Sequence, residues 1–211
     1  MNHRIVIIDY GVGNLFSLQR AFRAVSGEAL IASDVDTIYS ADALVLPGVG
    51  SFEAGMRGLR LRGLIDVVKN AATKGTPILG ICLGAQLLLS EGHEFGVHQG
   101  LDIIPGKVLK FEGLTQNEKI PHVGWNNISP PEEVTWKGTV LDLVEKASKV
   151  YFVHSYILAP RNKEHTFGLT TYGGKEFCSI VKKGKIIGVQ FHPEKSGETG
   201  LRIIKNFVSA L

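Results

Sequence analysis

Apolar residues in the first half of the chain form short continuous runs that end at a glycine or a polar residue. The runs are Ile5–Ile8, Ala43–Leu46 and Pro77–Ile81, with a weaker one at Leu30–Ile31. Strands that are buried on both faces of a parallel sheet have this near-continuous apolar pattern. We therefore predict parallel strands at these four positions.

The segments between these runs carry apolar residues at helical spacing. Apolar residues three or four apart from Leu15 to Val25 predict a helix that Gly27 ends. One further helix is expected from about residue 51 to Thr73, and another from Leu83 to Leu89. Strands that alternate with helices in this way indicate an α/β fold around a central parallel sheet.

The second half of the chain is richer in predicted strands. The segment Lys183–Gly184 is expected to be a hairpin turn, and a final helix is expected to start near Ser196. Residues 112–148 show no regular pattern. A length of 211 residues suits one domain over residues 1–211, with an additional region of strands. The strands predicted in this half are Val108–Phe111, Tyr151–Leu158, Thr166–Thr171, Phe177–Lys182 and Lys185–Phe191.

Composition excludes several classes of function. The formal charge is only +3 and the basic residues are scattered, so nucleic-acid binding is not indicated. No apolar run is long enough for a signal peptide or a membrane span, which favours a cytoplasmic protein. Two cysteines, Cys82 and Cys178, do not suggest a disulfide framework. They are either two inert core thiols or include one reactive thiol in a reducing compartment.

The motif Gly80-Ile81-Cys82-Leu83-Gly84 lies between a predicted strand and a predicted helix. It is the cysteine version of the G-x-S-x-G nucleophile elbow, in which a sharp turn exposes the nucleophile above the sheet. The glycines are expected because side chains would clash in so tight a turn. The helix that follows would present its N-terminus to the sulfur and favour a thiolate. The alternative for Cys82 is a structural cysteine in a glycine-rich strand.

A thiolate nucleophile needs a base, and the base needs a group that orients it. His192 and Glu194 are two residues apart at the end of the last predicted strand, where alternate side chains point the same way. We therefore expect Glu194 to hold the His192 imidazole toward Cys82. Taken without the elbow, these residues are better explained as a capping histidine and a solvated glutamate.

An acyl-transfer site also needs N–H donors for the developing oxyanion. The segment Pro47-Gly48-Val49-Gly50 follows the third predicted strand, and its glycines leave the backbone N–H groups unhindered. We predict an oxyanion hole from Val49 and Gly50 together with Leu83. The alternative for this segment is a plain turn between a strand and a helix.

Cofactor motifs are incomplete in this sequence. The segment from Gly11 to Phe16 begins like a dinucleotide fingerprint but lacks its third glycine. The segment from Gly100 to Val108 resembles a phosphate-binding loop, but it is one residue too long and lacks the final Ser or Thr. The histidines show no metal-ligand spacing. We therefore expect no NAD, no ATP and no metal.

These motifs are together similar to those of a known family. Gly80–Gln86 with Gln190–Glu194 resembles the class I, triad-type glutamine amidotransferases. A narrower set of segments is similar to the glutaminase subunits of imidazole glycerol phosphate synthase, and the resemblance covers essentially the whole chain. Differences from the usual family pattern are Ala85, Ile157 and Phe177–Ser179. The segments of the narrower set are Asp9–Asn14, Leu46–Gly50, Ile120–Asn126, Tyr151–Tyr156 and His192–Ser196.

The resemblance implies a flavodoxin-like class I glutamine amidotransferase fold, with a mostly parallel sheet, helices on both faces and an extra antiparallel strand region. It implies that Cys82 attacks L-glutamine and that His192 protonates the leaving ammonia. The glutamine contacts it implies are Gly48, Gln86, Glu94, His154, Ser155 and Tyr156.

The resemblance also implies a partner, a cyclase subunit with a (β/α)₈ barrel that forms a heterodimer with this chain. The cyclase would use the ammonia to make imidazole glycerol phosphate and an aminoimidazole carboxamide ribotide in histidine biosynthesis. Two alternatives stay open: a related glutaminase that supplies a nucleotide-sugar amidating enzyme, and a catalytically silent regulatory module. The residues that the resemblance places on the partner-facing surface are Asn14, Pro121, Trp125 and Lys195.

Overall fold

A computed structural model of the chain describes residues 3–25, 27–115 and 118–211. Its centre is a parallel sheet in the order β2-β1-β3-β4-β13, the strand order of flavodoxin-like folds. The predicted parallel strands are confirmed to within two residues. Their bounds are β1 Ile5–Ile8, β2 Ala29–Ala32, β3 Ala43–Leu46, β4 Ile78–Ile81 and β13 Ile186–Val189.

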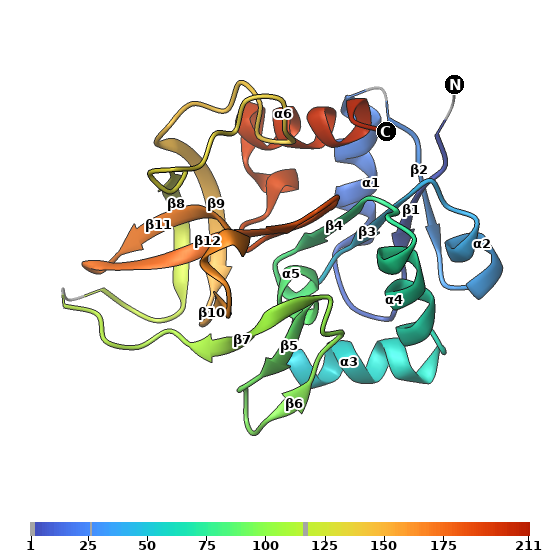
Figure 1. The fold of residues 1–211 in the computed structure, drawn as a ribbon, viewed down its shortest axis with the longest axis horizontal. Coiled ribbons are helices and arrows are strands. Elements are labelled where there is room, and N and C mark those ends of the chain that lie inside the picture. The colour runs from blue at the N-terminus through green and yellow to red at the C-terminus, as the bar shows by residue number, and fades with distance from the viewer. Residues whose placement is uncertain (1–2, 26, 116–117) are drawn as a thin grey trace.

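Helices cover both faces of this sheet (Figure 1). On one face α1 and α6 pack against alternate strand residues such as Ile7 and Val45. On the other face α3 and α4 pack against Val6 and Leu44, so each strand is buried on both sides. None of the helices in the described ranges is long and apolar enough to cross a membrane. The helices are α1 Leu15–Ala24, α2 Val35–Tyr39, α3 Phe52–Leu61, α4 Ile65–Thr73, α5 Leu83–Leu87 and α6 Gly197–Ser209.

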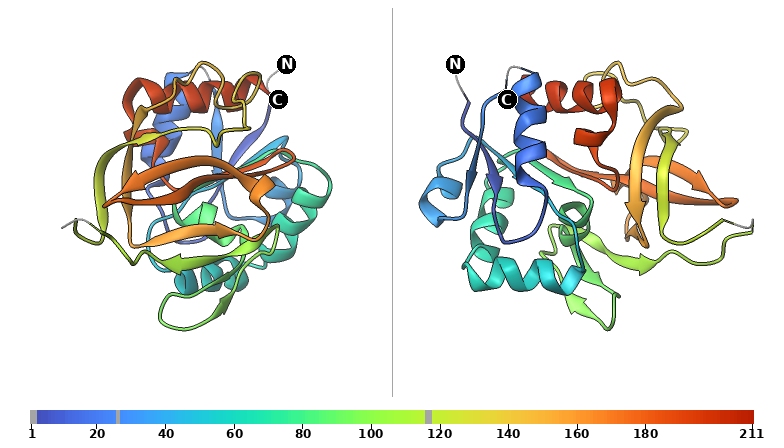
Figure 2. Two further views of the ribbon diagram at one scale, coloured as in Figure 1. Left: turned by 60° about the vertical axis from the view of Figure 1, so that its left-hand side comes forward. Right: turned by 180° about the vertical axis from the view of Figure 1, so that it is seen from behind.

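Mainly antiparallel strands extend the sheet beyond β13, which confirms the predicted additional strand region. The order continues β12-β10-β7-β5-β6, and β11 also pairs with β12, along most of its length. A separate two-stranded sheet, β8–β9, stands beside β11 and β12 (Figure 2). The strands are β5 Leu89–Gly92, β6 His98–Gln99, β7 Ile104–Lys110, β8 His122–Ile128, β9 Ser148–His154, β10 Tyr156–Pro160, β11 Thr166–Tyr172 and β12 Lys175–Lys183.

Several predicted elements differ from the structure. The long helix expected to end at Thr73 is two helices, because the chain turns at Gly63, whose φ is +66°. The strand expected over Tyr151–Leu158 is two strands that part at Ser155. The helix after Cys82 ends at Leu87, and β5 begins two residues later. Residues 112–148, expected to be irregular, contain β8.

Candidate active site

Loops from three parallel strands meet at the carboxyl edge of the sheet, where flavodoxin-like folds bind ligands. Cys82 follows β4, the Pro47–Gly50 loop follows β3, and His192 lies just beyond β13. Cys82 donates its backbone N–H to the Val189 carbonyl at 2.8 Å, which joins two of these loops. Together they open onto a pocket of about 270 Å³. Its lining residues are Val49, Gly50, Cys82, Leu83, Gln86, Glu94, Pro121, Val153, His154, Ser155, Tyr156 and His192.

The turn at Cys82 has the strained geometry of a nucleophile elbow. Its φ of 51° and ψ of −109° are sparsely populated for residues other than glycine. A Cβ on Gly84 would lie 1.7 Å from the Leu46 carbonyl oxygen, and a Cβ on Gly80 would lie 2.9 Å from the Ala85 backbone. The glycines are therefore required by close packing of backbone on backbone, as the motif predicted. With only five residues, α5 supplies a weaker helix dipole than the predicted helix would.

His192 and Glu194 are in contact, but not through the predicted strand. β13 ends at Val189, and the two residues belong to a one-turn 3₁₀ helix with His192 at its N-cap. That turn places Glu194 Oε1 2.8 Å from His192 Nδ1, and the Glu194 side chain is only 5% exposed. Ser196 fixes the same turn, because its hydroxyl donates to the His192 carbonyl at 2.6 Å and accepts from the Tyr151 N–H at 2.9 Å.

The charge around His192 favours its protonated form. Burial on its own would lower the pKa of His192, but the adjacent Cys82 sulfur and Glu194 carboxylate raise that pKa to about 10. His192 Nε2 is buried and makes no hydrogen bond to any of the described residues. The imidazole is thus held by Glu194 on one nitrogen, while the other is available to Cys82 and to a ligand.

Two buried glutamines form a hydrogen-bonded pair of which Gln190 lies next to the Cys82 sulfur, and Gln190 was not among the predicted site residues. Gln190 Nε2 lies 3.7 Å from Cys82 Sγ, and Gln190 Oε1 accepts from Gln86 Nε2 at 3.2 Å. Gln86 also reaches the Tyr156 carbonyl at 3.4 Å. Gln190 stands two residues before His192 in the Gln190–Glu194 motif. This position beside the predicted base is the signal that could have identified Gln190. Gln190 thus contacts the thiol, and Gln86 links Gln190 to the pocket wall at Tyr156.

Tyr10 holds the loop that was predicted to form the oxyanion hole. Its hydroxyl, fully buried, donates to the Pro47 carbonyl. Gly48 is packed so tightly that a Cβ there would lie 2.7 Å from Leu83 Cβ. Gly50 has a φ of +114° with open space around it, so the loop can reorient on the Gly50 side. No local pattern indicates this role of Tyr10, because its contact with Pro47 spans 37 positions.

The residues expected to contact glutamine are brought together, with Gln86, Glu94 and His154–Tyr156 on the pocket wall. Gly48 is buried behind this wall, against Leu83. Glu94 Oε2 accepts the Phe52 N–H at 2.7 Å, at the start of α3. This contact anchors Glu94 through one of its two carboxylate oxygens.

The four residues expected to face a partner are all exposed. Trp125 is 54% exposed and meets the Tyr151 ring edge to face, with ring centroids 6.1 Å apart. The Lys195 ammonium lies 5.8 Å from the same ring, so the two residues flank Tyr151 next to the His192 turn. Asn14 caps α1 by accepting from the Ser17 N–H at 3.3 Å, and Pro121 lies at the pocket.

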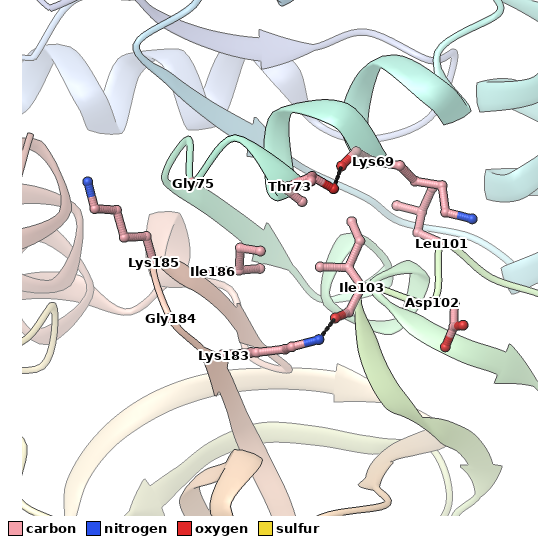
Figure 3. A pocket seen from close by; sticks show the side chains of 11 residues that line it. Lys69, Thr73, Gly75, Leu101, Asp102, Ile103, Lys183, Gly184, Lys185 and Ile186 are labelled. Carbon is pink, nitrogen blue, oxygen red and sulfur yellow. Dashed lines mark hydrogen bonds between the residues drawn. The ribbon is translucent and has the colours of Figure 1, made fainter.

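A second hollow, of about 430 Å³, lies at the opposite edge of the sheet and is lined by three lysines. The ammonium groups of Lys69 and Lys185 point in opposite directions (Figure 3). Lys183 Nζ donates to the Ile103 carbonyl at 2.9 Å. The lysine side chains of this hollow therefore do not point toward one common position, as Cys82 and His192 do. Cys178 is also unlike Cys82, because burial raises the pKa of its thiol to about 12.

Comparisons with known proteins agree with this geometry. The family "Glutamine amidotransferase class-I" matches residues 6–211. The chain is 46% identical over 208 residues to the imidazole glycerol phosphate synthase subunit HisH 1 of Legionella pneumophila (strain Paris), covering 97% of this chain and 98% of that protein. It is 44% identical over 208 residues to the corresponding HisH subunit of Geobacter sulfurreducens, covering 97% of each.

Solved structures share the fold at lower identity. A crystal structure of a glutamine amidotransferase has a TM-score of 0.73 at 16% identity and covers 98% of this chain and 99% of its own. PurLQS from Thermotoga maritima has a TM-score of 0.71 at 16% identity, covering 100% and 99%. By sequence match and by fold, this chain belongs to the class-I glutamine amidotransferase family and, within it, to the HisH subunits.

Proposed function

We propose that this chain hydrolyses L-glutamine to glutamate and ammonia as the glutaminase subunit of an imidazole glycerol phosphate synthase, with Cys82, His192 and Glu194 as its catalytic residues. The observation that carries the proposal is the juxtaposition of a strained cysteine and a carboxylate-held histidine in one small pocket. The pocket, at about 270 Å³, is near the lower end of the range for small-molecule sites, roughly 300–1,000 Å³. That size suits an amino acid rather than a nucleotide.

The reaction begins with attack of the Cys82 sulfur on the side-chain amide carbon of glutamine. The positive charge of protonated His192 lies beside the sulfur and favours a thiolate as the attacking group. The carbonyl oxygen becomes an oxyanion as the C–S bond forms. The N–H groups of Leu83 and of the Val49–Gly50 loop are the donors that receive it, and one such donor is typically worth about 10²–10³ in rate.

Collapse of this intermediate breaks the C–N bond, and His192 gives its Nε2 proton to the departing nitrogen. Ammonia leaves, and a glutamyl thioester remains on Cys82. Neutral His192 then takes a proton from water, which attacks the thioester carbon and releases glutamate with return of the thiolate. Glu194 keeps the Nδ1 proton of His192 in place throughout.

Recognition of the amino-acid end of glutamine uses the opposite wall of the pocket. The second carboxylate oxygen of Glu94 suits the ammonium group of the substrate. Gln86 and the backbone of Ser155 and Tyr156 supply polar groups along the rest of its length. Gly48 permits close packing of the loop behind them. All of these groups line or back the pocket that holds Cys82.

The ammonia passes to a cyclase subunit with a (β/α)₈ barrel, which makes imidazole glycerol phosphate and aminoimidazole carboxamide ribotide in histidine biosynthesis. The exposed residues Asn14, Pro121, Trp125 and Lys195 form the proposed contact surface of this heterodimer. We further propose that residues 1–211 act as a single glutamine amidotransferase domain. Its place is the cytoplasm, since a free thiolate requires a reducing compartment.

The test compares two alanine variants in the complex with the synthase subunit of the same organism. Cys82→Ala should release no glutamate from glutamine. Cys178→Ala is the matched control, since this second buried thiol lies outside the pocket, and it should retain glutaminase activity. Substantial glutamate release by Cys82→Ala would show that another group is the nucleophile.

A further inference from the structure

Two histidines form a buried hydrogen-bonded pair behind the candidate active site. His122 on β8 and His154 on β9 are direct neighbours in the antiparallel pair, and they are 2% and 5% exposed. His122 Nδ1 lies 3.0 Å from His154 Nε2. A buried imidazole nitrogen without a hydrogen bond would destabilise the fold, so both rings are expected to be hydrogen-bonded.

The contacts fix which nitrogen of each ring carries the proton. His154 Nδ1 lies 2.9 Å from the Tyr156 carbonyl, which can only accept, so His154 Nδ1 is protonated and its Nε2 is an acceptor. His122 must then donate from Nδ1, which leaves its Nε2 to accept from Asn126 Nδ2 at 3.4 Å. Asn126 is oriented by the Asn127 N–H, which donates to its Oδ1 at 2.7 Å.

The result is a one-directional chain of hydrogen bonds from β8 to the pocket wall. It runs from Asn126 through His122 and His154 and ends on the carbonyl of Tyr156. That carbonyl also accepts from Gln86, which contacts the glutamine beside Cys82. This series of hydrogen bonds therefore ends on the backbone segment whose residues Ser155 and Tyr156 line the pocket.

Aromatic rings keep both histidines in place and neutral. His122 stacks between Tyr172, at a centroid distance of 3.9 Å, and Phe152, at 4.8 Å. His154 stacks parallel to Phe111. Burial lowers the pKa of His122 to about 4, and burial together with the charges of His122 and His192 lowers the pKa of His154 to about 3. Neither ring is a general base near neutral pH.

The opposite face of β8 is open to solvent. Side chains alternate along this strand, so His122 and Asn126 point inward while Val123 and Trp125 point outward. A single strand thus carries the inner hydrogen-bond chain on one face and exposed apolar residues on the other.

We propose that His122 is a positioning residue of the glutamine pocket: through His154 it sets the Tyr156 carbonyl, and so the wall on which the substrate lies. The inference rests on the proposed function, since the wall matters only if the pocket takes glutamine. His122 touches no reacting atom. It is expected to affect glutamine binding rather than the bond-breaking steps at Cys82.

The first test is independent of catalysis. In the full-length protein, nitrogen-15 NMR of the imidazoles should find both histidines neutral at pH 5.5 and both protonated on Nδ1. Proton on Nε2 of either ring, or a normal histidine titration for His122, would overturn the chain of hydrogen bonds.

The second test measures glutaminase kinetics in the complex with the synthase subunit. His122→Phe keeps the stacked ring but removes the donor, and it should raise KM for glutamine about 5- to 30-fold, the factor expected for one lost buried hydrogen bond. The kcat should change much less. His122→Asn restores an N–H donor and should recover most of the loss. His165→Phe is the matched control, since His165 is buried but lies outside the pocket.

The outcomes separate the two proposals. If the wild-type complex does not hydrolyse glutamine, the proposed function fails, and the NMR result still decides the hydrogen-bond chain. If the wild type is active and His122→Phe leaves KM unchanged, or if His165→Phe raises it equally, the positioning role is wrong. If His122→Phe does not fold, the positioning role is tested by the KM of His122→Asn and by the NMR assignment.

Discussion

Replacing Glu194 by glutamine tests the charge relationship at the centre of the candidate site. The substitution keeps the shape of a side chain that is only 5% exposed and removes its negative charge. Glu194 Oε1 lies 2.8 Å from His192 Nδ1, a distance at which a carboxylate strongly favours the imidazolium. We expect Glu194→Gln to fold normally and to lose glutaminase activity.

The size of the effect follows from the contact. An opposite charge at such a distance raises a histidine pKa by about 1–3 units, so the pKa of His192 should fall by that amount in Glu194→Gln. Each unit is worth about 1.4 kcal/mol, which gives about 1.4–4 kcal/mol. If this energy stabilises the imidazolium in the rate-determining step, kcat/KM should fall about 10- to 1,000-fold.

Two measurements check the prediction. Carbon-13 NMR of the histidine Cε1 atoms reports the pKa of His192 in each protein, and steady-state assays in the complex report kcat/KM. Glu164→Gln is the matched control. Its carboxylate lies 3.7 Å from a histidine nitrogen, but its side chain is 75% exposed and outside the pocket. An unchanged pKa of His192 in Glu194→Gln, or equal rate losses in both variants, would refute the role given to Glu194.

Three further predictions follow from the same contacts. Gly84→Ala should lower the free energy of unfolding by more than about 3 kcal/mol in urea, because its Cβ would lie 1.7 Å from a backbone oxygen; Gly75→Ala, in open space at φ +79°, should cost only about 1–2 kcal/mol. Tyr10→Phe leaves the buried Pro47 carbonyl unpaired and should lower kcat for glutamine hydrolysis. The rate at which iodoacetamide alkylates Cys82 should be the same in this variant as in the wild type. A slower alkylation would contradict a role of Tyr10 that is limited to the oxyanion loop. Burial holds the pKa of His122 near 4 and that of His154 near 3, against 6.5 in the unfolded chain, so the unfolded state binds more protons. This stabilisation is present above pH 6.5 and is lost as the pH falls toward 4. In urea titrations, the free energy of unfolding of His122→Phe should therefore fall less between pH 7 and 4.5 than that of the wild type.

The fold was predictable where apolar content alone decides structure. β1, β3 and β4 are buried on both faces, so their sequences are almost continuously apolar. β8 was missed because its inward face carries two polar residues, His122 and Asn126, so its sequence lacks the alternation of apolar and polar residues that predicts a strand. Both side chains are hydrogen-bonded to residues of other strands. The division between α3 and α4 depends on the backbone of Gly63, and α3 runs through glycines because Gly58 packs on the Tyr10 backbone.

The candidate site was predictable where the chemistry is local in sequence. The elbow at Cys82 and the contact between His192 and Glu194 each lie within a few residues, although the second arises from a 3₁₀ turn rather than a strand. The supporting contacts of Tyr10 and Gln190 join residues that are 37 and 108 positions apart. Such contacts follow from the order of the strands in the sheet. That order cannot be read from a single sequence.

The most direct measurement of the central claim uses the complex of the synthase subunit with Cys82→Ala. Since this chain is proposed to contribute only ammonia, the variant complex should form no imidazole product from glutamine. The same complex should regain product formation when an ammonium salt at alkaline pH replaces glutamine. Product from glutamine would contradict the role of Cys82 as nucleophile, and loss of product with both nitrogen sources would show that Cys82 serves the structure instead.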